Sequence, residues 1–281
     1  MKMSNDNKEF RKSIMHLSLL MCLGSGAAMA GGQQTLELDA ISVEGQADEL
    51  PGVVDSATVG TITAEQLKNR PMARTGELME VVPGLIVSQH SGEGKANQYY
   101  LRGFNLDHGT DLATFVDDVP VNMPTHAHGQ GWTDTNFVIP ELIDNIQYKK
   151  GPYYAEEGDF SAAGAVRMYY ANKLDKGITK VEGGQFGYYR ALAADSARVD
   201  GGDLLYAFDI SQYDGPWDLP QNYDKKNIMF RYTKGDRKNG FTLAALSYRG
   251  DWQSTDQIPL RAVDSIGLWG NVDPTDGGIS H

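Results

Sequence analysis

Glycine and proline divide residues 83–170 into short segments, and this punctuation constrains what the region can form. Gly permits turn conformations that other residues avoid, and Pro ends helices. The runs between them are short and rich in β-branched and aromatic side chains, which is typical of strands. Four punctuated segments stand in order: VPGL at 82–85, LRGFN at 101–105, FVDDVPV at 115–121, and KKGP at 149–152 with AGAV at 163–166. We therefore expect a small α+β unit made of short elements.

The expected elements of this unit include a few helix signals. Thr63, with Gln66 three residues later, forms a capping-box pattern for a helix that ends before Pro71. Thr75 is expected to cap a second helix, and a third is expected over 137–143. Strands are expected at 58–62, 85–88, 98–102, 112–116, 119–121, 145–149 and 165–170.

Residues after 172 show a different pattern, in which apolar and polar side chains alternate over longer runs. The clearest runs are 204–211 and 228–233, with weaker ones near 179, 191 and 241–248. Short and long connections follow one another along this part of the chain. The alternation and the connection lengths are typical of a transmembrane β-barrel. A soluble β-sandwich alternates too, so this pattern alone leaves both architectures open.

The first 30 residues have the features of a secretory signal peptide: a basic start, an apolar core at 14–23 and an Ala-Met-Ala cleavage signature at 28–30. The apolar core is about half the length that a membrane-spanning helix needs, so an anchor is disfavoured. Cys22 is the only cysteine; bulky Met21 precedes it, which disfavours a lipoprotein. The mature chain would then have no disulfide framework. Export without a spanning helix leaves the periplasm, the outer membrane or the medium.

Charge and motifs narrow the function classes. The formal net charge is −12 and the pI is about 4.9. This balance argues against a nucleic-acid partner and against electrostatic docking on anionic lipid. Signatures of metalloproteases, serine hydrolases and P-loop proteins do not occur in the sequence. An H-x-H pair followed by Asp also occurs in metal hydrolases, but we expect no enzyme here.

The leader, the punctuated segments and the alternating strands together resemble the TonB-dependent outer-membrane receptors over residues 36–250. The resemblance implies an α+β plug domain followed by antiparallel strands of an incomplete transmembrane β-barrel. Whole receptors of this family enclose the plug in a barrel of about 22 strands. The resemblance also implies a place in the outer membrane of a Gram-negative cell, in contact with its lipid. The partner that drives uptake would be TonB, with its inner-membrane energising complex.

The resemblance divides the chain into four parts. These are a signal peptide at 1–30, a TonB box and linker at 31–50, a plug domain at 51–172, and the N-terminal part of a barrel with about five strands at 173–281. The plug and the TonB box would face the periplasm. Five strands cannot close a barrel, and lipid does not tolerate an open sheet edge. We therefore expect the chain to be the N-terminal part of a longer receptor.

Several residues match family motifs position by position. Arg102-Gly103 matches a strand end in the plug core, and Gly151-Pro152 matches a turn after the last long plug strand. The glycines are expected at turns, and Arg102 is expected to be held by plug hydrogen bonds or barrel carboxylates. Arg167 departs from the common family residue, which leaves the subfamily and the cargo open. The residues that match the TonB box, whose alternation suits strand addition to a partner's sheet edge, are Asp39, Ala40, Ile41, Ser42, Val43 and Glu44.

The sharpest chemical feature is the loop NMPTHAHGQGWTD at 122–134. In an extended segment, His126 and His128 would lie on one face and could bind a metal together. Imidazole and carboxylate ligands suit zinc, copper or nickel better than calcium or magnesium. The candidate ligand-binding residues are His126, His128, Trp132, Asp134, Asp107 and His108, with His90 a more distant one. Two alternatives remain: a solvated polar loop, or rings of His126, His128 and Trp132 that stack on an organic siderophore.

These observations predict a receptor for uptake of a scarce nutrient, most plainly a metal ion or a metal chelate such as a ferric siderophore. Zinc, copper, nickel or an iron chelate would be cargo, and no cofactor is required. One alternative is a truncated plug protein that does not transport. Another is a TonB-linked signalling receptor, which is disfavoured because residues 31–37 leave no room for the extra domain of such receptors.

Overall fold

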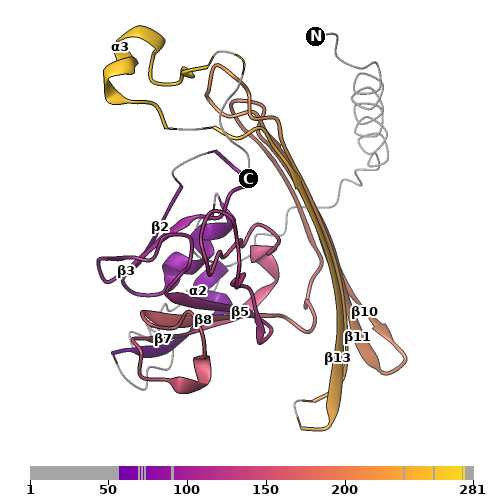
Figure 1. Ribbon diagram of the computed structural model, residues 1–281. Helices are drawn as coiled ribbons and strands as arrows, with labels where there is room; N and C mark the ends of the chain where they lie inside the picture. The colour runs from indigo at the N-terminus through magenta and orange to yellow at the C-terminus, as the bar shows by residue number, and fades with distance from the viewer. Residues whose placement is uncertain are drawn as a thin grey trace, which may run out of the picture. The chain divides into compact units, whose positions relative to one another are not determined.

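The computed structural model describes residues 57–68, 70, 72, 74–89, 92–236, 238–255, 257–273 and 275. The predicted signal peptide, the predicted TonB box and His90 lie outside these residues. Figure 1 shows short strands and helices in the first part of the described chain and long strands in the second. Within the described residues, no helix is both long and apolar enough to span a membrane.

Two small sheets form the first part of the described chain. The larger has the order β1-β7-β8-β5-β6; β5 and β8 run parallel and the other pairs antiparallel. The smaller has the order β2-β3-β4 and is antiparallel. Their strands are β1 Val59–Thr63, β2 Leu85–Ser88, β3 Gln98–Leu101, β4 Phe104–Asn105, β5 Leu112–Val116, β6 Val119–Pro120, β7 Ile143–Lys150 and β8 Gly164–Tyr170. The strands predicted in this region are therefore confirmed, and β4 is an addition.

Helix α2 is shorter than the sequence predicts, and the other helical segments of this part are 3-10 helices. The helical segments are α2 Ala64–Lys68 and the 3-10 helices η1 Thr75–Val81, η2 Pro140–Leu142 and η3 Ala155–Glu157. The Thr63 N–H donates to Gln66 Oε1 at 2.9 Å, as the capping-box pattern predicts. The predicted cap at Thr75 is wrong, because the preceding Arg74 is the N-cap and its N–H donates to Glu77. The helix predicted over 137–143 is wrong too, since Pro140 starts a single turn that already ends at β7.

Two tight turns explain how such short strands pair. Arg102 and Gly103 join β3 to β4 with φ angles of 52° and 84°. Asp117 and Asp118 join β5 to β6 with φ angles of 49° and 64°. Two consecutive positive φ values define the hairpin turn that matches the twist of antiparallel strands. The predicted turn after Gly151 is also present, with a φ of 97° at that glycine.

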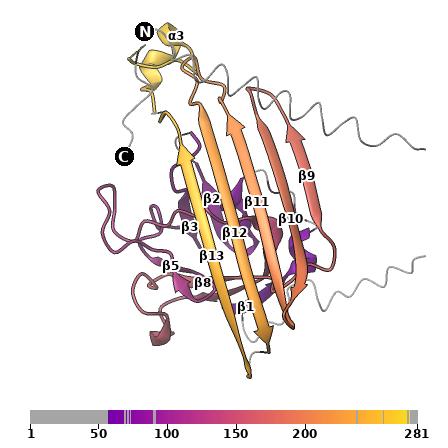
Figure 2. The ribbon, with the colours of Figure 1, turned by 90° about the vertical axis from the view of Figure 1, so that its right-hand side faces the viewer.

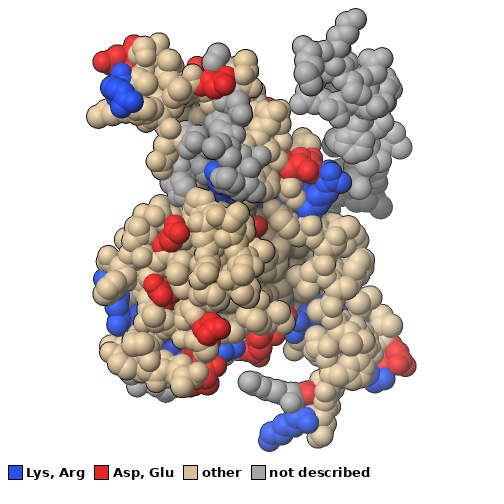
Figure 3. Space-filling view, viewed as in Figure 1, with Lys and Arg blue, Asp and Glu red and all other residues tan. Residues whose placement is uncertain are grey.

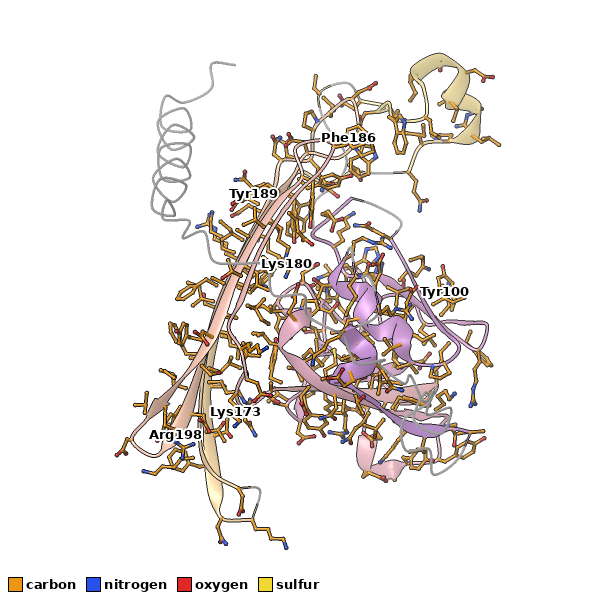
Figure 4. The ribbon with its side chains drawn as sticks, turned by 180° about the vertical axis from the view of Figure 1, so that it is seen from behind. Tyr100, Lys173, Lys180, Phe186, Tyr189 and Arg198 are labelled. Atoms are coloured by element: carbon orange, nitrogen blue, oxygen red, sulfur yellow. The ribbon has the colours of Figure 1, made fainter. Side chains whose placement is uncertain are left out.

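Five long strands form the second part, and each pairs antiparallel with the next (Figure 2). They are β9 Ile178–Gly183, β10 Tyr189–Val199, β11 Gly202–Tyr213, β12 Tyr223–Gly235 and β13 Gly240–Asp251. Figure 4 shows Phe186 and Tyr189 toward one end of this sheet and Arg198 at the opposite end. A short 3-10 helix η4, Leu260–Ala262, and helix α3, Val263–Ile266, follow. The predicted series of antiparallel strands is confirmed.

The long strands have two chemically different faces. Phe208, Ile210 and Phe230 leave 43–44% of their surface exposed on the outer face. On the other face, Leu205 and Ala207 are fully buried and belong to the same apolar core as the first part of the chain. The alternation read from the sequence therefore separates an exposed apolar face from a face covered by the first part of the described chain. This is the arrangement of a wall strand in an outer-membrane barrel.

A chain of charges also ties the 3-10 helix η2 to the long strands. Glu141 on η2 accepts hydrogen bonds from Arg190 at 2.6 and 2.8 Å and from Lys180 at 3.1 Å. Arg190 also donates to the fully buried Asp209, which in turn lies 3.3 Å from Lys225 Nζ. Burial by itself would raise the pKa of the Glu141 carboxyl. The Arg190 guanidinium, together with the hydrogen bonds from Lys180 and from the backbone, outweighs burial and lowers that pKa to about 2.

The substitution Glu141→Gln tests this contact. The lowered pKa stabilises the fold above pH 4.5, and the contribution is lost as the pH falls toward 2. At pH 7 we expect the free energy of unfolding to drop by about 3 kcal/mol, as a shift of this size implies. Urea unfolding in detergent between pH 7 and pH 2 should show the two proteins converging. The exposed Glu156→Gln is the control and should leave the midpoint unchanged. A gap that stays constant over the pH range contradicts the assignment.

Candidate functional site

The loop that carries the predicted histidines is closed at its base. Met123 and Trp132 form an antiparallel bridge, with the Met123 N–H donating to the Trp132 carbonyl at 2.9 Å. The Gly131 N–H donates back to the Met123 carbonyl at 2.8 Å. Gly131 has a φ of 76°, and a Cβ there would lie 2.9 Å from the Thr110 Cα. Only glycine fits this position without strain, so the base of the loop is closely specified.

The buried side chain of Asn122 holds the loop base to the sheet. Its Oδ1 accepts the Thr114 N–H at 2.7 Å. Its Nδ2 donates to the carbonyls of Gly109 and Gly131 at 3.0 and 2.9 Å and to Thr133 Oγ1 at 2.7 Å. Three separate stretches of chain therefore meet at one amide. Asn122 is not among the site residues predicted from the sequence; its position directly after a strand, ahead of Met-Pro, is the signal that could have indicated it.

Three histidines surround Trp132, which is only 9% exposed. The ring of His126 stacks on the indole with centroids 4.2 Å apart and planes 12° apart. His108 lies 4.5 Å from the indole, and His128 contacts it edge-on at 5.2 Å. The rings of His108 and His128 lie 4.6 Å apart. We call these four residues, together with the adjacent Asp107, the histidine cluster.

Three members of the histidine cluster converge at one point. Single ligand atoms of Asp107, His108 and His128 all lie within 4.8 Å of one another. The Nε2 of His108 is 3.7 Å from Asp107 Oδ1. His108 is 2% exposed, and its Nδ1 lies 2.9 Å from the Ala96 carbonyl and 3.1 Å from the Asn97 carbonyl. A buried imidazole, an exposed imidazole and an exposed carboxylate therefore share one small region of surface.

The structure pairs the histidines differently from the sequence prediction. His126 and His128 were expected to lie side by side on an extended strand. Residues 124–130 instead follow bends and a turn, so the period of two does not apply. The Nδ1 of His126 accepts the backbone N–H of His128 at 3.1 Å, and its ring stacks on Trp132. The group of possible ligands contains His108 where the sequence suggested His126.

The other predicted residues lie away from the histidine cluster. Asp134 accepts the Asn136 N–H at 2.8 Å, and burial raises the pKa of its carboxyl. Arg102 is exposed, and its N–H donates to the Gly84 carbonyl at 2.9 Å. Gly103, Gly151 and the exposed Pro152 occupy turns, as described above.

A second concave region lies between the first part of the chain and the long strands. This cavity of about 940 Å³ is lined by Arg74, Glu93, Tyr188, Tyr213 and Trp217, among others. None of the predicted site residues that the structure describes lines it. On the face drawn in Figure 3, acidic and basic side chains are scattered in small groups, and in several places both signs lie side by side.

Several known proteins are similar to this chain in sequence. Residues 52–165 match the sequence family described as "TonB-dependent Receptor Plug Domain". The ferrienterobactin receptor of Escherichia coli (strain K12) is 30% identical over 121 residues, which cover 39% of this chain and 16% of that protein. The probable TonB-dependent siderophore receptor PirA of Acinetobacter baumannii is 27% identical over 301 residues, which cover 95% of this chain and 38% of PirA.

The solved structures agree with the sequence relatives on the fold. The crystal structure of the siderophore receptor PirA from Acinetobacter baumannii superposes with a TM-score of 0.52 at 18% identity, over 71% of this chain and 32% of that one. At such identity the likeness concerns architecture alone. This chain therefore spans well under half the length of these relatives.

Substitution of Asn122 by Ala tests how the loop is held. The change removes the acceptor of the Thr114 N–H and the hydrogen bonds that tie residues 109, 131 and 133 to one amide, so we expect the loop base to open more often. Hydrogen exchange of a peptide covering 123–133, measured by mass spectrometry, should speed up at least tenfold. The control is Gln130→Ala in the same loop, where the side chain is exposed. Equal exchange in both variants would show that Asn122 does not hold the loop.

Proposed function

We propose, because this chain belongs to the TonB-dependent receptor family, that it serves the TonB-driven uptake of a metal ion or a metal chelate across the outer membrane. The observation that carries the choice of cargo is the histidine cluster. It combines imidazole and carboxylate groups, which bind transition metals, with an indole and a stacked imidazole, which suit flat organic groups. Relatives named as ferrienterobactin and siderophore receptors support the same class of cargo.

The position of the histidine cluster within the fold supports this proposal. His126, His128 and Trp132 of the cluster lie on the loop after β6, and Asp107 and His108 lie on the turn between β4 and β5. The plug domain of this family carries cargo-binding loops at the place of the loop after β6, as the resemblance implies. Asn122 and the Met123–Trp132 bridge give the loop a fixed base. A binding group on a rigid base loses less entropy when it captures a ligand at low concentration.

The energy for uptake would come through the segment that matches the TonB box, Asp39 to Glu44. Its alternating side chains would let it add as a strand to the edge of a TonB sheet. The plug and this segment would then face the periplasm. The long strands β9–β13 would form part of the surrounding wall, with Phe208 and Phe230 toward lipid. The relatives are receptors and transporters, which supports transport over catalysis.

Two proline substitutions test the transport role. Ile41→Pro removes a backbone N–H inside the predicted TonB box and should prevent strand addition. Ala47→Pro places the same residue in the linker outside the box and is the control. In cells that express the gene from its own locus under metal limitation, we expect Ile41→Pro to abolish uptake of the cargo as completely as loss of TonB does. Ala47→Pro should retain it.

The cargo in this experiment is found by mass spectrometry of cell metal content with zinc, copper, nickel and ferric enterobactin supplied one at a time. Deletion of the gene should lower accumulation of at least one of them. The proposal is overturned if deletion changes none of them, or if Ile41→Pro and Ala47→Pro cells accumulate metal equally.

A further inference from the structure

We infer that Asp107, His108 and His128 form a direct binding site for one divalent first-row transition-metal ion, with the indole of Trp132 beneath it. This inference deepens the proposed function by naming the cargo class and its ligands. It rests on the proposed function only for what happens to the metal after binding. The binding step stands on the local geometry of the cluster.

The hydrogen bonds of His108 prepare its ring for a metal. Its Nδ1 faces two backbone carbonyls, those of Ala96 and Asn97. Carbonyl oxygens only accept hydrogen bonds, so Nδ1 carries the proton in the neutral ring. The lone pair then lies on Nε2, the atom that faces the Asp107 carboxylate. A histidine that binds metal through one nitrogen usually donates the other N–H to a carbonyl or carboxylate, which fixes the ring.

The ligand atoms of Asp107, His108 and His128 have to come slightly closer together to bind one ion. Ligand atoms at about 2.1 Å from a tetrahedral zinc lie about 3.4 Å from one another. The His108 Nε2 to Asp107 Oδ1 distance of 3.7 Å is already close to this value. The whole set lies within 4.8 Å, so the ligand atoms have to approach one another by at most about 1.4 Å. Because His128 is exposed on a loop while His108 is buried, we expect His128 to make this movement.

Glycine at position 129 leaves room for this arrangement. A Cβ at Gly129 would lie 3.2 Å from Asp107 Oδ2, which is tighter than nearly all real contacts. Without it, the carboxylate can turn toward His128 as the loop closes. Binding would thus connect the tip of the loop to the turn between β4 and β5, which carries Asp107 and His108. A bound metal should therefore protect residues 124–131 from exchange and proteolysis.

The chemical nature of the three ligand atoms determines which class of ion binds best. Two imidazole nitrogens and one carboxylate oxygen suit zinc, copper or nickel, whereas calcium and magnesium prefer sets made of oxygen alone. Three protein ligands leave at least one position for water or for an atom of a chelator. A site of this kind can exchange ligands, which suits an ion that has to be passed on.

His126 acts as a positioning residue in this arrangement. Its Nδ1 accepts the His128 N–H, and its ring packs flat against Trp132. Its removal should loosen the loop without removing a ligand. This distinguishes the site from the His126–His128 pair that the spacing of the sequence suggests, in which the two rings would contribute equally.

The experiment uses the purified chain in detergent, titrated with Zn²⁺ against a chromophoric chelator and with Ni²⁺ or Cu²⁺ by fluorescence. Trp132 lies within 5.2 Å of both ligand rings, so a paramagnetic ion at the site should quench its emission. We expect one ion per chain. Asp107→Asn and His128→Ala should each weaken binding at least tenfold, or about 1.4 kcal/mol. His126→Ala should weaken it less than either, and the exposed Asp159→Asn should leave it unchanged.

His108→Ala is expected to abolish binding, and circular dichroism shows whether that variant still folds. If His108→Ala does not fold, the variants at the exposed positions Asp107 and His128 still decide the test. The inference is overturned by absence of stoichiometric binding. It is also overturned if Asp107→Asn binds as well as the unchanged chain, or if His126→Ala loses binding while Asp107→Asn keeps it.

The outcomes separate this inference from the proposed function. If the chain binds no bare ion but the gene still supports TonB-dependent uptake of a ferric chelate, the metal site is wrong and the uptake role stands. If the chain binds one ion through these residues but cells lacking the gene accumulate metal normally, the site stands and the uptake role is wrong.

Discussion

Coverage of one face of the long strands is the constraint on which the rest of this structure depends. Leu205 and Ala207 are buried against the plug core, while Phe208 and Phe230 on the opposite face are exposed. Every charged side chain on the covered face then needs a partner, because an unpaired buried charge is costly. Arg190 forms ion pairs with Glu141 and Asp209. Similarly, Arg231 pairs with Asp117 in the β5–β6 turn.

These polar contacts have a further consequence for the plug. Ion pairs that lose much of their hydration when they form contribute less net stability than apolar packing of the same size. An interface that combines Glu141–Arg190 and Asp117–Arg231 with apolar packing can thus be specific without being very strong. The loop after β6 is held separately, through Asn122, whose hydrogen-bond partners all lie between Gly109 and Thr133.

The parts of the fold that the sequence could predict are those where one physical rule dominates. Alternation over 204–211 and 228–233 marks long strands with two different faces, and the structure has them in β11 and β12. The Asp117-Asp118 turn follows from side chains that tolerate positive φ. The helices differ more, because Pro140 begins a single 3-10 turn that ends at β7, and the segment capped by Arg74 is a 3-10 helix over Thr75–Val81. Strand β4 has only two residues, too few for any periodicity to show.

The sequence predicted which residue types form the candidate site, but not which of those residues lie next to one another. His126 and His128 stand out in the sequence, but the bends at 124–130 remove the strand geometry on which their pairing depended. His108 is brought to His128 by hydrogen bonds made elsewhere, at Asn122 and at the carbonyls of Ala96 and Asn97. Sequence spacing carries no information about such contacts. A crystal structure of the zinc-loaded protein with anomalous scattering tests the metal site directly. We predict a peak about 2.1 Å from Nε2 of His108, with His128 and Asp107 as its other protein ligands. A peak between His126 and His128, or none in the histidine cluster, contradicts it.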